Sequence, residues 1–137
     1  MTDFAATAEV LTAILAKADE MLSSAERAVE ARAHGDAASR AYYAVFHALS
    51  AVLATRGLSY SSHSQTLGAF NREFVKTGAF APETSRQLQR LFEDRQIADY
   101  DWKRHVDQDT ARRDVADAAA LVAGCKRFIR EQPGSST

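Results

Sequence analysis

Arg95 and Asp99 stand four residues apart at the end of a predicted helix, and Tyr100 follows directly. Arg95 lies on the same side of that helix as the apolar Leu91 and Phe92, so its guanidinium is expected to face inward. An Arg and an Asp at this spacing can form an intrahelical ion pair if the helix extends as far as Asp99. Because a guanidinium offers a planar fork of N–H donors, it also suits a phosphate group. We therefore expect Arg95 to bind phosphate, Asp99 to orient it and Tyr100 to stack or donate a hydrogen bond.

A second polar group, Arg40, Tyr43 and His47, has the spacing of one helix face. Tyr42, Val45, Phe46, Leu49, Val52 and Leu53 occupy the opposite, core-facing side. The polar group is flanked by small residues, Ala41, Ala44, Ala48 and Ala51, instead of the Lys and Glu of a solvated face. A helix with apolar or small residues on both sides is usually buried on both sides. The polar group should therefore lie at a second contact, with another helix or a second copy of the chain, and a buried Arg40 there needs a partner.

His63 begins another predicted helix and follows a serine-rich loop. A helix N-terminus can receive an anion, so His63 is a further candidate phosphate ligand; the alternative is a partly exposed neighbour of the N-cap. His, Asp and Glu residues do not show the helical spacing of a bundle di-metal site. No metal site or cofactor is therefore predicted.

Five helices would position these groups. The periodicity of apolar residues predicts them at about 3–33, 36–55, 64–76, 82–97 and 107–131, with an irregular stretch at 99–105. Gly35 is expected to stop the first helix, Asp36 to cap the second, and Ser62 with Gln65 to cap the third. Short connections imply antiparallel neighbours. The fold class is thus all-α, an up-and-down bundle of four to five antiparallel helices, forming one domain over 1–131 with a flexible tail over 132–137.

Composition agrees with this fold and excludes several classes of protein. The chain has 137 residues, a formal net charge of −1 and one cysteine, Cys125. Alanine is abundant and β-branched residues are few, which favours helix. The near-zero charge argues against general coating of nucleic acid, and one cysteine cannot build a disulfide framework. Neither a signal peptide nor a membrane span is apparent, so we expect a cytoplasmic protein with no membrane partner.

Three stretches together resemble the HEPN family of small helical domains. They are residues 39–48 (SRAYYAVFHA), His63-Ser64 followed by residues 70–78 (FNREFVKTG), and residues 95–101 (RQIADYD). They occur in the family's order and cover most of residues 36–101. The resemblance implies a helical bundle, often a homodimer. It also implies a partner, because many HEPN proteins are encoded with a minimal nucleotidyltransferase in toxin–antitoxin or defence modules.

Active members of that family resemble metal-independent ribonucleases, with an Arg followed a few residues later by a His. After Arg95 that histidine would stand at residues 100–102, which are Tyr100, Asp101 and Trp102. Arg40 and His47 have the right spacing but lie on the second helix. The candidate catalytic residues are accordingly Arg95 and His47. The candidate phosphate or nucleotide ligands are Arg40, Tyr43, His63, Arg95, Asp99 and Tyr100.

The sequence leaves three functions open. The first is a HEPN protein that binds nucleotide or RNA phosphate as the helical partner of a nucleotidyltransferase. The second is a ribonuclease toxin in which His47 or another group replaces the missing histidine, with His as the proton-transfer group and Arg stabilising the phosphorane. The third is a non-catalytic interaction module in which the polar groups only form ion-pair networks.

Overall fold

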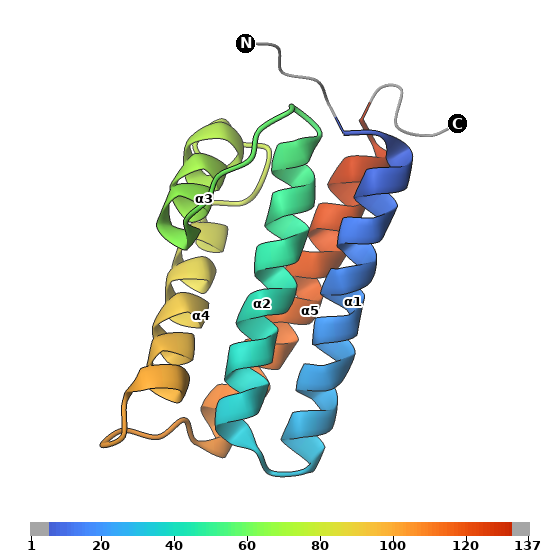
Figure 1. Ribbon diagram of the computed structural model, residues 1–137. Helices are drawn as coiled ribbons and strands as arrows, with labels where there is room; N and C mark the ends of the chain where they lie inside the picture. The colour runs from blue at the N-terminus through green and yellow to red at the C-terminus, as the bar shows by residue number, and fades with distance from the viewer. Residues whose placement is uncertain (1–5, 133–137) are drawn as a thin grey trace.

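The computed structural model describes residues 6–132, and all of its regular structure in that range is helical. Four long helices, α1 (Ala8–Glu30), α2 (His34–Ala54), α4 (Glu83–Tyr100) and α5 (Gln108–Arg130), alternate in direction along the chain (Figure 1). The short helix α3 (His63–Phe70) and the π-helical turn η1 (Asn71–Val75) lie between α2 and α4 in the chain. The predicted all-α up-and-down bundle is thereby confirmed.

Helix α2 is the centre of the bundle and packs against α1, α5, α4 and α3. Figure 1 shows α1 and α5 on one side of α2 and α4 with α3 on the other. The four alanines predicted to mark a second packing face, Ala41, Ala44, Ala48 and Ala51, are all fully buried. Because α2 contacts helices on both sides, that second face is covered by other helices of the same chain. Small side chains let those helices approach closely, which is why this part of the core is rich in alanine.

The turn between α1 and α2 differs from the prediction. Gly35 does not stop the first helix but lies in the first turn of α2, which starts at His34 and not after Asp36. The left-handed residue of the turn is Arg32, with φ 61°. Ala33 donates its backbone N–H to the carbonyl of Ala28 and so caps α1. The glycine was misjudged because the sequence does not say which residue of a short turn takes the left-handed conformation.

Other helix ends are close to those predicted, with two differences that matter for the site. The predicted helix over 64–76 is divided into α3 and η1, because the hydrogen-bonded turns widen after Phe70. Helix α4 continues to Tyr100 instead of ending near residue 97, so Asp99 and Tyr100 are helical and not irregular. Helix α1 begins at Ala8, where Thr7 caps it; predicted helical residues 3–5 and tail residues 133–137 lie outside the described part.

Within the described residues, no helix is long and apolar enough to cross a membrane.

Candidate phosphate-binding site

Three helices bring aromatic and charged side chains together around Arg95. We use the name Arg95 site for Tyr42 and Tyr43 of α2, His63 of α3, and Arg95, Asp99 and Tyr100 of α4. Arg95 is only 7% exposed although it carries a charge. Its Cζ lies 5.0 Å from the ring centre of Tyr42, 5.5 Å from that of Tyr43 and 5.9 Å from that of Tyr100. The guanidinium is therefore held within a cage of aromatic rings, where cation–π attraction offsets part of its lost hydration.

The polar contacts of Arg95 leave much of its donor capacity unused. One terminal nitrogen, Nη2, lies 3.2 Å from Nδ1 of His63. The other, Nη1, lies 3.6 Å from the Asp99 carboxylate, which is too long for a strong hydrogen bond. The Nε atom is buried and has no hydrogen-bond partner. A guanidinium has five N–H donors, so these contacts do not fill the donor capacity of Arg95.

The proximity of Arg95 indicates which tautomer of His63 is present. The Tyr42 hydroxyl lies 2.8 Å from Nδ1 of His63, the same atom that Arg95 approaches. Because a guanidinium can only donate, Nδ1 must accept and the proton must sit on Nε2. The imidazole also stacks on Phe46, with ring centres 4.3 Å apart. The neutral ring thus presents an Nε2–H donor and not a free base.

The surroundings of the two side chains favour an uncharged His63 and a charged Arg95. Burial lowers the pKa of His63 below its ordinary value, and the Arg95 charge lowers it further. Burial raises the pKa of Tyr42 to about 12, against the opposing effect of Arg95. Burial opposes the charge of Arg95, but Tyr43, Tyr42 and Asp99 outweigh it and raise the pKa of the guanidinium. The site therefore keeps its cation over the whole physiological pH range.

Ser62 determines where α3 begins and so where His63 stands. Its hydroxyl accepts a hydrogen bond from the backbone N–H of Gln65 at 3.1 Å, as the sequence predicted. Ser62→Ala should lower the free energy of unfolding by about 1 kcal/mol, because it leaves an N-terminal N–H of the helix unsatisfied. Urea unfolding measures this, with the exposed neighbour Ser61→Ala as the matched control. Equal stability of the two variants would show that this cap does not hold α3.

The structure joins four of the predicted ligands to Arg95 and leaves one, Arg40, apart. Tyr43, His63, Asp99 and Tyr100 all contact it, directly or through its aromatic cage. Arg40 is half-buried and forms no ion pair within residues 6–132 of this single chain. The partner predicted for Arg40 stays a prediction for a contact with a second copy of the chain.

His47 also lies outside the aromatic cage. Its ring packs edge-on against Phe46, with centres 6.1 Å apart. Burial lowers its pKa, and the charges of Lys17 and His63 lower it further. No hydrogen bond joins His47 to Arg95 in the part of the chain that the structure describes. Within one copy of the chain the two residues are thus not joined, and a catalytic pairing of Arg95 with His47 stays a prediction for two copies.

Sequence reasoning missed Tyr42 as a site residue and counted it only as core. It is 1% exposed, and its hydroxyl is the group that fixes His63. A signal was available, because the hydroxyl of a buried tyrosine usually finds a hydrogen-bond partner. Phe92 was also counted only as core, although its ring centre lies 5.5 Å from Cζ of Arg95.

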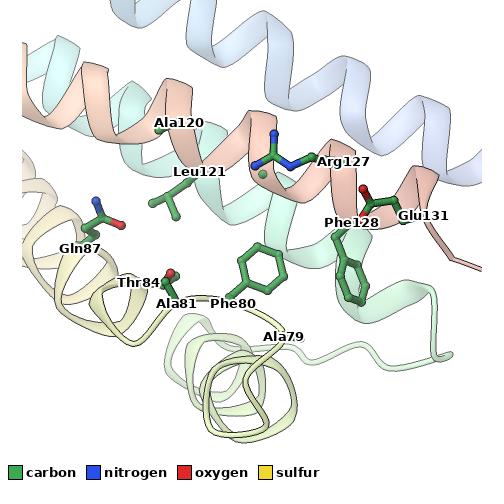
Figure 2. A pocket seen from close by; sticks show the side chains of 11 residues that line it. Ala79, Phe80, Ala81, Thr84, Gln87, Ala120, Leu121, Arg127, Phe128 and Glu131 are labelled. Atoms are coloured by element: carbon green, nitrogen blue, oxygen red, sulfur yellow. The ribbon is translucent and has the colours of Figure 1, made fainter.

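A separate pocket of about 310 Å³ lies between the start of α4 and the end of α5 and shares no residue with the Arg95 site. Figure 2 shows Phe80 and Phe128 on its apolar side, with Arg127 and Gln87 at its border. Its walls carry few convergent polar groups, so it does not compete with the Arg95 site as a place for phosphate. Among residues 6–132, moreover, no three His, Cys, Asp or Glu side chains are grouped to hold a metal ion.

Comparisons with known proteins match nearly the whole chain. The model of the HEPN domain family matches residues 11–128. A "UPF0332 protein" of Thermotoga maritima is 34% identical over 115 residues, which are 84% of this chain and 87% of that protein. A protein of Methanocaldococcus jannaschii named "Putative toxin MJ0605" is 29% identical over 123 residues, 90% of this chain and 91% of its own. Another from that organism, "Putative toxin MJ0142", is 32% identical over 91 residues, 66% and 62% of the two chains.

Proposed function

Because this chain belongs to the HEPN domain family, we propose that it is a toxin-like HEPN protein whose Arg95 site binds a phosphate group of a nucleotide or of RNA. The observation that carries the proposal is a 7%-exposed guanidinium with a partnerless Nε and a loose 3.6 Å carboxylate contact. A purely structural arginine at this burial would be expected to have its donors filled. The relatives named as putative toxins support the proposal that this chain is toxin-like.

The chemistry of the site suits a phosphate. Its donors are the N–H groups of Arg95, whose charge and planar fork suit an oxyanion. Asp99 orients the guanidinium from the next turn of α4, where its carboxylate remains partly exposed. Tyr43 and Tyr100 supply ring faces beside the cation. A mixed set of charge, hydrogen-bond donors and aromatic faces is typical of nucleotide and RNA recognition.

The geometry favours binding over RNA cleavage. A general base needs an unprotonated nitrogen within reach of the proton it removes. The Nδ1 atom of His63 is taken by Tyr42 and Arg95, and its Nε2 carries the proton. The residues after Arg95 place Tyr100, Asp101 and Trp102 where a catalytic histidine is missing. We therefore place ribonuclease activity second to phosphate binding.

The resemblance adds a biological setting to this proposal. Many HEPN proteins are encoded with a minimal nucleotidyltransferase, so we propose such a protein as the partner and a cytoplasmic homodimer as the form of this chain. A partner enzyme that handles nucleotides is consistent with a phosphate site on the helical protein. Co-purification of the two proteins, and light scattering of this chain alone, test these two points separately.

Binding of a short fluorescent oligoribonucleotide, followed by fluorescence anisotropy, tests the proposal. Arg95→Lys keeps the positive charge but loses the planar fork, so we expect affinity to fall about tenfold. Arg86→Ala, on the exposed side of the same helix, removes a charge without touching the site and should bind nearly as well as the unaltered protein. Equal affinity of all three proteins, or absence of binding by the unaltered protein, would refute a phosphate site at Arg95.

A further inference from the structure

Two aromatic side chains project into solvent directly after the Arg95 site. Tyr100 is 71% exposed and Trp102 is 90% exposed, more than the other exposed large hydrophobic residues in the described range, Val10 and Tyr60. Figure 1 shows the connection from α4 to α5, which carries Trp102, at one end of the bundle. An exposed indole ring gains nothing from folding, because its apolar surface stays in water. Both rings are therefore available to stack against a ligand.

Hydrogen bonds to the Asp101 carboxylate stabilise the turn that carries Trp102. One oxygen of Asp101 accepts hydrogen bonds from the backbone N–H groups of Lys103 and Arg104, each at 2.9 Å. The other oxygen accepts from Nε of Arg104 at 2.7 Å. These hydrogen bonds lower the pKa of Asp101 to about 2. The largest contributions come from the backbone and side chain of Arg104, followed by the backbone of Lys103. The carboxylate therefore stays ionised, and the turn holds Trp102 outward at any ordinary pH.

The surroundings of these rings carry positive charge. Lys103 and Arg104 follow Trp102 and are both exposed. A shallow hollow of about 390 Å³ lies among Gln96, Tyr100, Asp101, Trp102, Lys103 and Arg104. The ring of Tyr100 faces this hollow and also lies 5.9 Å from the Arg95 guanidinium. Tyr100 thus lies both at this hollow and beside Arg95, which does not itself line the hollow.

We propose that Tyr100 and Trp102 are a stacking platform for the bases of single-stranded RNA, with one of its phosphates at Arg95. This inference rests on the proposed function and specifies its ligand as a strand and not a lone nucleotide. A single strand presents unpaired base faces joined by phosphates, which matches rings that lie beside Arg95 and the exposed Lys103. A second copy of this chain is a poorer match, because the only fixed carboxylate of the turn, Asp101, is already neutralised by Arg104.

Trp102 is the single tryptophan of the chain, so its intrinsic fluorescence reports on this surface alone. Titration with a short unstructured oligoribonucleotide should quench that fluorescence to saturation, because stacked bases quench an indole. The same RNA annealed to its complement should quench far less, since its bases are not available for stacking. AMP, which has a phosphate but no neighbouring base, should bind more weakly than the oligonucleotide. Equal quenching by strand and duplex would overturn the platform.

Substitutions separate the platform from the phosphate site. Trp102→Ala should weaken binding of the fluorescent oligoribonucleotide at least fivefold, the lower end of the contribution of one stacked base. Trp102→Phe should restore part of the loss, and Tyr60→Ala serves as the control for removing an exposed aromatic ring. If Trp102→Ala binds normally while Arg95→Lys binds weakly, the platform is wrong and the phosphate site stands. If Trp102→Ala instead lowers the mass measured by light scattering and leaves RNA binding intact, the rings form an interface between copies, which also overturns the platform.

Discussion

Asp114→Asn is expected to remove most of a fall in stability that the unaltered protein shows between about pH 4 and pH 8. Asp114 of α5 is fully buried, and neither of its carboxylate oxygens accepts a hydrogen bond. Burial, followed by the side chain of Asp94, raises the pKa of Asp114 to about 8, while Arg113 opposes the rise and Asp117 adds to it. Folding therefore favours the protonated acid, which can donate its proton to the Asp94 carboxylate.

The direction of the pH effect follows from this raised pKa. Below about pH 4, Asp114 is protonated in the folded and the unfolded protein, and its contribution to stability is fully present. As the pH rises toward 8, the unfolded chain releases the proton and the folded protein retains it. The free energy of unfolding then decreases by about 1 kcal/mol for each pH unit. An asparagine carries no proton to lose, and its amide can donate to Asp94 in the same place.

Urea unfolding at a series of pH values measures this effect. At pH 8 the Asp114→Asn variant should be more stable than the unaltered protein by several kcal/mol, and at pH 4 the two should be similar. Asp109→Asn, on the exposed first turn of the same helix, is the control and should leave the slope unchanged. Parallel stability curves for the unaltered protein and Asp114→Asn would show that the buried acid is ionised at neutral pH.

The second large effect concerns Arg95 itself. Arg95→Ala should lower the free energy of unfolding by about 2–4 kcal/mol, because it removes contacts with four aromatic rings and the hydrogen bond to His63. Arg95→Met should recover much of that loss, since a flexible apolar side chain suits an aromatic cage. Urea unfolding of the two variants measures the difference.

The pKa of His63 reports on the charge of Arg95, which a stability measurement does not. The Arg95 charge contributes to the lowered pKa of His63, so this pKa should rise in Arg95→Met, as followed by NMR of the imidazole ring. Arg95→Met should also fold without binding RNA, which separates the structural and ligand roles of the guanidinium. A stable Arg95→Met protein that binds RNA normally would assign Arg95 to the fold alone.

The helical fold was predictable because its signals are local. Apolar residues at helical spacing, the Ser62 cap and the alanines of α2 each determine structure within a few residues of themselves. The end of α4 was harder, since Asp99 and Tyr100 look like loop residues in isolation. In the structure both residues contact Arg95, and α4 continues through them to Tyr100. Helix ends depend on such tertiary contacts, which no local pattern contains.

The candidate site was predictable only in part, for a related reason. Arg95, Asp99 and Tyr100 share one helix, so their spacing alone placed them together. The pairing of Arg95 with His63 joins residues 32 positions apart and depends on how α3 packs. Tyr42 was missed because a tyrosine on a core face has the same local appearance whether or not its hydroxyl contacts another polar side chain.

Binding of a phosphate to the Arg95 guanidinium can be observed by ¹⁵N NMR of its Nε–H group. The Nε of Arg95 is buried and has no partner, whereas Arg86 of the same helix is exposed and provides an internal comparison. During titration with a short oligoribonucleotide, the Arg95 Nε–H signal should shift and saturate together with binding, while that of Arg86 stays in place. An Arg95 signal that does not move when the RNA is fully bound would contradict the account.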